Sequence, residues 1–231
     1  YIFEFINGFH DTANAIATSV YTKALTPKRA ILLAACMNFV GALVSEKVAM
    51  TISQGIVNIC LEMYVIMAAL IGAIIWNLFT WWRGIPSSSS HALIGGLIGA
   101  SIVYTAGTEN IIWSGVFEKV VVPLFTSPIM GFLIGFLFMK SIFKIFIKWS
   151  QRKVNKVFLK LQIFSSAFVA FSHGNNDAQK TMGIITLALI TGGILDESTG
   201  VPLWVKFTCA ITMALGTSLG GWKIMKTMGG S

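Results

Sequence analysis

Long apolar runs are the feature that most restricts what this chain can fold into. Seven stretches of mostly apolar residues follow one another, each long enough for a membrane span of about 20 residues. Charged residues make up 11% of the chain and hydrophobic residues 55%, and the mean hydropathy is +0.76. A soluble domain typically has about 25% charged residues. So few charges cannot cover a water-exposed surface, and the sequence predicts an all-α, polytopic membrane protein.

The charges between these runs predict how the chain crosses the membrane. The expected spans cover residues 1–22, 30–52, 63–82, 87–106, 119–147, 161–191 and 203–225. Basic residues follow the first, third, fifth and seventh spans, whereas acidic residues lie in the other connections. The positive-inside rule places the basic connections in the cytoplasm. We therefore expect a multi-pass protein of the cytoplasmic membrane, with the first and sixth spans antiparallel.

One basic segment is singled out by its density of charge. Residues 140–160 hold seven of the 17 Lys and Arg residues of a chain with a net charge of +8. Lys140, Lys144, Lys148 and Arg152 recur at helical spacing among apolar side chains. The pattern predicts an amphipathic helix at the inner membrane interface, and a solvated linker is the alternative. Because basic residues lie between apolar runs, we do not expect nucleic acid as a partner.

Two polar motifs interrupt the first and sixth spans. Residues 7–15 read NGFHDTANA and residues 172–181 read SHGNNDAQKT. Aligning Gly8 with Gly174 places Asp11 on Asp177, so a Gly-x-x-Asp core recurs in two spans of opposite direction. Carboxylates inside a membrane normally face protein, water or an ion. The motifs predict broken helices and inverted-topology repeats around a central site; carboxylates that only bond freed backbone are the alternative.

A run of serines precedes the fourth span. Residues 84–91 read GIPSSSSH, and Pro followed by Ser is typical of a helix N-terminus. Free backbone N–H groups, hydroxyls and the positive end of the helix dipole together predict an anion site, with a plain N-cap as the alternative. The adjacent Ser90 and His91 do not form a nucleophile–base pair, and we expect no enzymatic activity.

These residues resemble a known family. Residues 5–18 and 170–180 resemble the two signatures of the inorganic phosphate transporter (Pit) family, and residues 86–91 are similar to its hairpin motif. The bacterial low-affinity permeases are the most similar branch. The resemblance implies inverted repeats with a re-entrant-type helical hairpin, and symport of phosphate with a cation. It implies phosphate binding at Ser88, Ser89, Ser90 and Lys180, and cation or proton coupling at Asp11, Asn14, Asp177, His10 and His173.

Lys180 departs from the family pattern. Sodium-coupled members have Asp-x-x-Asn in both signatures, whereas the second signature here ends in Lys180. An ammonium one turn from Asp177 would occupy or repel a sodium site and attract phosphate. The coupling ion is therefore expected to be H⁺ rather than Na⁺, with no cofactor; a lysine that only extends towards the interface is the alternative. Sulfate transport by the same fold and an ion channel stay open as alternatives.

The expected organisation has three parts. Residues 1–139 form the first repeat with its hairpin, residues 140–160 the basic linker, and residues 161–231 the start of a second inverted repeat. Both ends look cut, since the family would supply a further span and a second hairpin. The expected partners are inorganic phosphate, the lipid bilayer, a divalent metal carried as its phosphate complex, and a second copy of the chain. The identity of any bound metal does not follow from the sequence.

Overall fold

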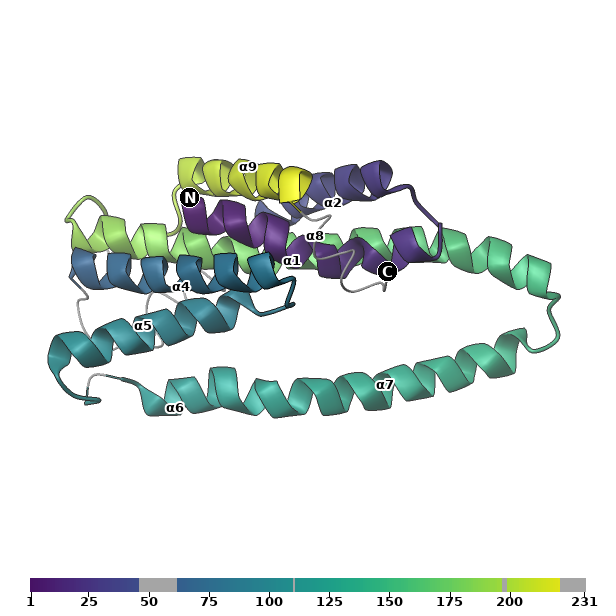
Figure 1. The fold of residues 1–231 in the computed structure, drawn as a ribbon, viewed down its shortest axis with the longest axis horizontal. Coiled ribbons are helices and arrows are strands. Elements are labelled where there is room, and N and C mark those ends of the chain that lie inside the picture. The colour runs from purple at the N-terminus through teal and green to yellow at the C-terminus, as the bar shows by residue number, and fades with distance from the viewer. Residues whose placement is uncertain (46–61, 110, 197–198, 221–231) are drawn as a thin grey trace.

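The chain folds into a bundle of helices (Figure 1). The structure, a computed structural model, describes residues 1–45, 62–109, 111–196 and 199–220. Every regular element in these ranges is helical, which confirms the predicted all-α class. The elements are α1 (Ile2–Tyr21), α2 (Pro27–Ala42), α4 (Met63–Arg83), α5 (Ser89–Thr105), α6 (Trp113–Val116), the π-helical turn η1 (Phe117–Val121), α7 (Val122–Phe146), α8 (Gln151–Thr191) and α9 (Leu203–Gly220).

Several helices are long and apolar enough to span a membrane. In the described ranges these are Met63–Arg83, the continuous run Trp113–Phe146 and Gln151–Thr191, with a shorter apolar helix at Leu203–Leu219. Helix α7 buries none of its residues, and phenylalanines such as Phe132 and Phe138 are exposed. An apolar helix that exposes side chains all round has lipid as its natural solvent. The chain is a multi-pass membrane protein, as predicted.

The predicted broken helices are wrong. Helix α1 runs without interruption through Asp11, and α8 runs for 41 residues through the whole second motif. Local hydrogen bonds replace the break, since Gln179 donates its amide to the carbonyl of Asn175 within the helix. Gly174 is needed for packing rather than for flexibility, because a Cβ there would lie 2.2 Å from the Asn38 carbonyl oxygen of α2.

Residues 140–160 do not form one helix of their own, and their position at the membrane interface stays a prediction. Helix α7 continues to Phe146, a short turn follows, and α8 begins at Gln151, ten residues before the predicted span. Aromatic packing holds this turn, because the Phe146 ring meets Trp149 at 4.7 Å and Phe158 at 5.3 Å between centroids. Lys153 lies 4.2 Å from the centroid of Trp149. The basic residues therefore surround a sharp corner between two long helices.

Two other span boundaries differ from prediction. Helix α2 ends at Ala42 rather than at residue 52, and residues 46–61 lie outside the described ranges. Helix α9 is described up to Gly220, so the predicted end at residue 225 falls outside as well.

Helices α1 and α8, which carry the two motifs, run in opposite directions (Figure 1). The contacts that α1 makes with α9 also resemble the contacts that α8 makes with α2. A Cβ added to Gly8 would lie 2.4 Å from the carbonyl oxygen of Met213, and one added to Gly174 would meet Asn38 in the same way. In the same way, Gly41 of α2 lies against the backbone of Phe171 in α8, and Gly216 of α9 lies against that of Phe5 in α1. Two copies of one helix pair related by a two-fold axis would make such contacts, and a full inverted repeat stays a prediction.

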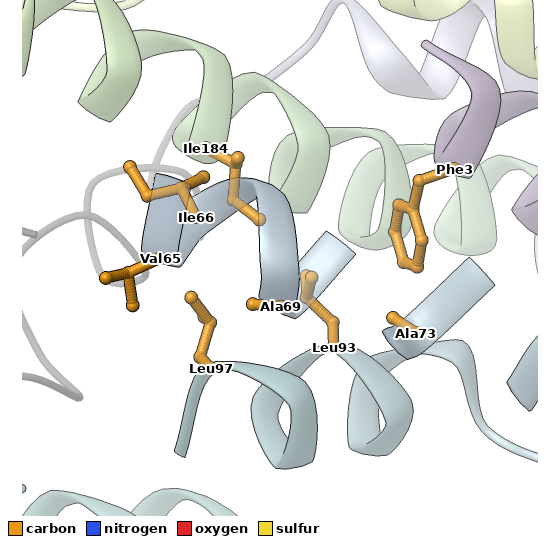
Figure 2. Close-up of a cluster of buried hydrophobic side chains, with 8 residues drawn as sticks. All are labelled: Phe3, Val65, Ile66, Ala69, Ala73, Leu93, Leu97 and Ile184. Carbon is orange, nitrogen blue, oxygen red and sulfur yellow. The ribbon is translucent and has the colours of Figure 1, made fainter. Parts of the chain in front are cut away.

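Helices α4 and α5 form a hairpin that enters the bundle from one end (Figure 1). Its turn lies beside the middle of α1 and α8 rather than at the far end of the bundle. Figure 2 shows the apolar cluster that fixes this position, in which Phe3 of α1 and Ile184 of α8 pack on the hairpin. The remaining members are Val65, Ile66, Ala69, Ala73, Leu93 and Leu97. This packing brings the serine run to the centre of the molecule.

Candidate functional site

A cavity of about 300 Å³ lies where the hairpin turn meets the two motif helices. Its polar lining combines carboxylates, hydroxyls and an imidazole, from segments far apart in the sequence. The lining residues are Asp11, Ala15, Ser87, Ser88, Ser90, Val169, His173 and Asp177. The sequence predictions therefore converge on one place, although the helices that carry the motifs are unbroken.

The first motif reaches the cavity through a chain of hydrogen bonds. His10 is buried, and its Nδ1 lies 2.8 Å from Oδ1 of the neighbouring Asp11, to which it donates. The other ring nitrogen, Nε2, lies 3.1 Å from Thr80 Oγ1. Thr80 Oγ1 in turn lies 3.0 Å from Ser87 Oγ. His10 thus orients the Asp11 carboxyl and ties α1 to the hairpin turn.

The second motif places a cation between its carboxylate and the serine run. Lys180 Nζ lies 2.5 Å from Asp177 Oδ1 and also donates to Ser90 Oγ. His173 Nε2 lies 3.4 Å from the other carboxylate oxygen of Asp177. The Lys180 and Asp177 side chains are 13% and 14% exposed, so water screens their attraction only weakly. Lys180 is therefore a positioned charge and not a lysine extended towards the interface.

The four serines of the run differ in what they can bind. Ser88 is the N-cap of α5, and its side chain accepts from the His91 backbone N–H. Ser87, Ser88 and Ser90 line the cavity. Ser89 points elsewhere, since it is buried, lies outside the cavity lining and has a hydroxyl with no partner in the described residues. The first turn of α5 also directs unpaired N–H groups and the positive dipole end to this region, which favours an anion.

Three of the lining residues could hold a metal ion together. Asp11, His173 and Asp177 each offer one ligand atom, and these atoms all lie within 4.8 Å of one another. Two carboxylates and an imidazole suit a divalent cation such as Zn²⁺ or Mn²⁺. Asp177 would then have to share its oxygens with Lys180.

Of the predicted residues, His10, Ser89 and Lys180 are not among the lining residues, although His10 and Lys180 bond to lining residues. Asn14 belongs to α1, but its side chain lies outside the part that the structure describes. Sequence reasoning missed Ser87 and Thr80, and also Asn38, which bonds Thr12, Thr217 and His173 from inside α2. Thr80 and Asn38 are single polar residues within apolar runs, and this pattern could have identified them as buried hydrogen-bonding residues.

Comparison with known proteins identifies the family. Residues 7–231 match the phosphate transporter family. The chain is 54% identical over 231 residues to a probable low-affinity inorganic phosphate transporter of Bacillus subtilis (strain 168), covering 99% of this chain and 69% of the relative. It is 45% identical over 229 residues to the protein of the same name in Mycobacterium tuberculosis (strain ATCC 25618 / H37Rv), covering 98% of this chain and 55% of the relative. The chain thus spans about half to two thirds of their length.

A solved structure supports the fold. The structure described as the sodium-dependent phosphate transporter matches with a TM-score of 0.81, over 99% of this chain and 75% of that one, at 24% sequence identity. The relatives are named as transporters, which confirms that no enzymatic activity is to be expected. From the family match and the identity with these relatives, the chain belongs to the phosphate transporter family.

Proposed function

We propose that the full-length protein carries inorganic phosphate across the membrane together with protons, and that the cavity at the hairpin turn is its phosphate site. The single observation that carries the proposal is the position of Lys180, whose ammonium bridges Ser90 of the hairpin and Asp177 of the second motif. The names of the relatives support phosphate as the substrate.

The phosphate contacts follow from the donors around the cavity. Hydroxyls of Ser88 and Ser90 and the N–H groups that begin α5 can donate to phosphate oxygens. Lys180 supplies the positive charge. Ser89 is left out of this assignment because it is buried outside the lining and bonds to none of the lining residues among the described contacts, whereas Lys180 donates to Ser90.

The carboxylates at the site explain why a cation must travel with phosphate. Asp11 and Asp177 line the same cavity as the serines. Like charges in a place of low dielectric repel strongly, so phosphate binding beside two carboxylates requires neutralisation by a proton or a cation. A phosphate that carries a proton can also donate to a carboxylate, which sulfate at neutral pH cannot do. This difference favours phosphate over sulfate.

Protons are favoured over sodium because of the same lysine. Lys180 already occupies Oδ1 of Asp177, an oxygen that Na⁺ would need as a ligand. His10 and His173 contact the two carboxyls and suit proton exchange. A divalent metal accompanying phosphate is a second candidate, favoured by the closeness of Asp11, His173 and Asp177.

The test uses the full-length protein in proteoliposomes, with a proton gradient or a sodium gradient imposed separately and sulfate as competitor. We expect proton-driven, sodium-independent and sulfate-resistant uptake of labelled phosphate. Asp11→Asn and Asp177→Asn should each abolish uptake while the protein still inserts into the membrane. Asp196→Asn is the matched control, because Asp196 is an exposed carboxylate in a connection. Undiminished uptake in both site variants would refute the assigned site, and sodium-driven uptake would refute proton coupling.

A further inference from the structure

A second buried carboxyl lies between α1 and α8, next to the proposed phosphate site. Glu4, in the first turn of α1, is completely buried. Thr181 of α8 donates its hydroxyl to Glu4 Oε2, and Glu4 Oε1 has no hydrogen-bond partner in the described residues. Thr181 directly follows Lys180, so this carboxyl is joined to the part of α8 that carries the site.

Glu4 is the last member of a polar seam between α1 and α8. The two helices are antiparallel (Figure 1), so polar residues that face each other follow in opposite order along the two chains. Thr22 donates to Gln162 at 2.7 Å, Asp11 faces His173, Asn7 lies beside Asp177, and Thr181 donates to Glu4. Thr22 and Gln162 also line a separate cavity of about 440 Å³ near the other end of α1. The seam thus joins the phosphate site to Glu4, whereas apolar residues such as Ile16 and Ala170 separate it from the cavity at Thr22.

Burial and nearby charge act on the ionised form of Glu4 in opposite directions. Removal from water disfavours a carboxylate, whereas a neighbouring cation stabilises it. The charged and titratable side chains near enough to act on Glu4 are Asp177 and Lys180 of α8 and Cys209 of α9. Of these, the Lys180 ammonium stabilises a negative charge on Glu4, although the same ammonium is also paired with Asp177.

We propose that Glu4 binds the proton that accompanies phosphate. The inference rests on the proposed phosphate site. Phosphate adds negative charge next to Lys180 and draws the ammonium towards its own oxygens, so Glu4 loses the positive charge that favours its ionised form. Glu4 therefore takes up a proton when phosphate binds and releases it when water reaches the seam. By reciprocity, protonation of Glu4 increases the affinity for phosphate.

Glu4→Gln removes the exchangeable proton but keeps an oxygen that can accept from Thr181. Glu62→Gln is the matched control, because Glu62 is an exposed glutamate just before α4. Glu4→Asp keeps a titratable group and tests for rescue. All three variants are made in the full-length protein.

The first readout is the infrared difference spectrum between phosphate-bound and phosphate-free protein, which detects a newly protonated carboxyl. We expect its C=O band in the wild type and in Glu62→Gln, its loss in Glu4→Gln, and a shifted band in Glu4→Asp. The second readout compares proton-driven phosphate accumulation with exchange of labelled for unlabelled phosphate. Accumulation in Glu4→Gln should fall about tenfold more than exchange, within the usual range of coupling energies.

The outcomes separate this inference from the proposed function. A wild type that binds no phosphate would refute the phosphate site itself. Phosphate binding with a carboxyl band that persists in Glu4→Gln would overturn the role of Glu4 alone. Equal losses of exchange and accumulation that Glu4→Asp does not rescue would also overturn it, since they would indicate a structural role.

Discussion

At the scale of single residues, Lys180 separates this chain from a pattern with Asp-x-x-Asn in both motifs. Asn14 occupies the aligned position in the first motif, whereas Lys180 forms an ion pair with Asp177 and a hydrogen bond with Ser90. One side chain therefore links the carboxylate that we assign to coupling with the hydroxyl that we assign to phosphate. Binding of the anion and the charge state of Asp177 cannot be independent.

Replacing Lys180 by Met should weaken phosphate binding and leave Asp177 without its main counter-charge. Removal of one partner of a buried ion pair typically costs about 3–5 kcal/mol, and the upper part of that range applies only to complete burial. We expect the phosphate dissociation constant of full-length Lys180→Met to rise at least about tenfold, which corresponds to about 1.4 kcal/mol. Isothermal titration calorimetry in detergent measures it.

Lys160→Met is the control for this change, because Lys160 lies exposed on the same helix. It removes the same charge outside the site and should bind phosphate like the wild type. Wild-type affinity in Lys180→Met would contradict a direct role of the ammonium. A similar loss in both variants would point instead to the overall charge of the chain.

Much of the candidate site could be predicted at this scale, for a physical reason. Carboxylates, amides and a lysine are rare inside apolar helices, so Asp11, His173, Asp177 and Lys180 stand out in the sequence. The hydroxyl of Ser89 does not line the cavity, because successive residues of a helix point in different directions and one sequence does not determine the rotation of α5. Glu4 was missed because it precedes the recognisable motif.

At the scale of elements, the continuous α8 shows why polar composition alone does not predict a break. The run from Ser172 to Thr181 has no proline, and most of its polar side chains find partners on the helix itself or on its neighbours. Helical backbone is then retained because every N–H and C=O stays paired in the membrane. Those partners come from α1, α2 and α5, and their closeness cannot be read from one sequence.

Close packing of the motif helices makes their glycines sensitive to a single methyl group. A Cβ on Gly174 would lie 2.2 Å from the Asn38 carbonyl oxygen, and one on Gly216 would lie 2.1 Å from that of Phe5. Backbone atoms cannot move aside as side chains do, so the helices must separate. We expect Gly174→Ala and Gly216→Ala each to lower the free energy of unfolding by about 1–3 kcal/mol, the usual effect of overpacking.

Thermal denaturation of the purified protein in detergent measures this effect. Gly135→Ala in α7 is the control, because among the described residues no atom outside the adjoining turns of α7 lies within 4 Å of the added Cβ. Alanine is the better helix former, so the control should melt at the same temperature or higher. Unchanged melting temperatures in the two packing variants would show that these helix contacts are looser than the structure indicates.

At the scale of the whole molecule, the ends of the bundle differ in charge. The α1–α2 connection, with Lys23, lies at the same end as the basic corner between α7 and α8 (Figure 1). The α5–α6 connection, with Glu109, and the α8–α9 connection, with Asp196, lie at the opposite end. Arg83 is the exception, because the hairpin turn holds it midway along the bundle. The other described connections thus keep basic and acidic residues at opposite ends, and the prediction fails at Arg83 because α4 and α5 form a hairpin.

This asymmetry predicts the orientation of the protein in the membrane. The positive-inside rule places the α7–α8 corner in the cytoplasm and the α5–α6 connection outside. Ser150 and Thr108 are exposed at these two places, and Cys36, Cys60 and Cys209 can be replaced by alanine to provide a background without thiols. In intact cells, a membrane-impermeant maleimide should label Thr108→Cys, whereas Ser150→Cys should react only after permeabilisation. Labelling of both variants from outside would mean that α7 does not cross the membrane, and the reversed pattern would mean that the corner lies outside and that lysine and arginine do not orient this chain.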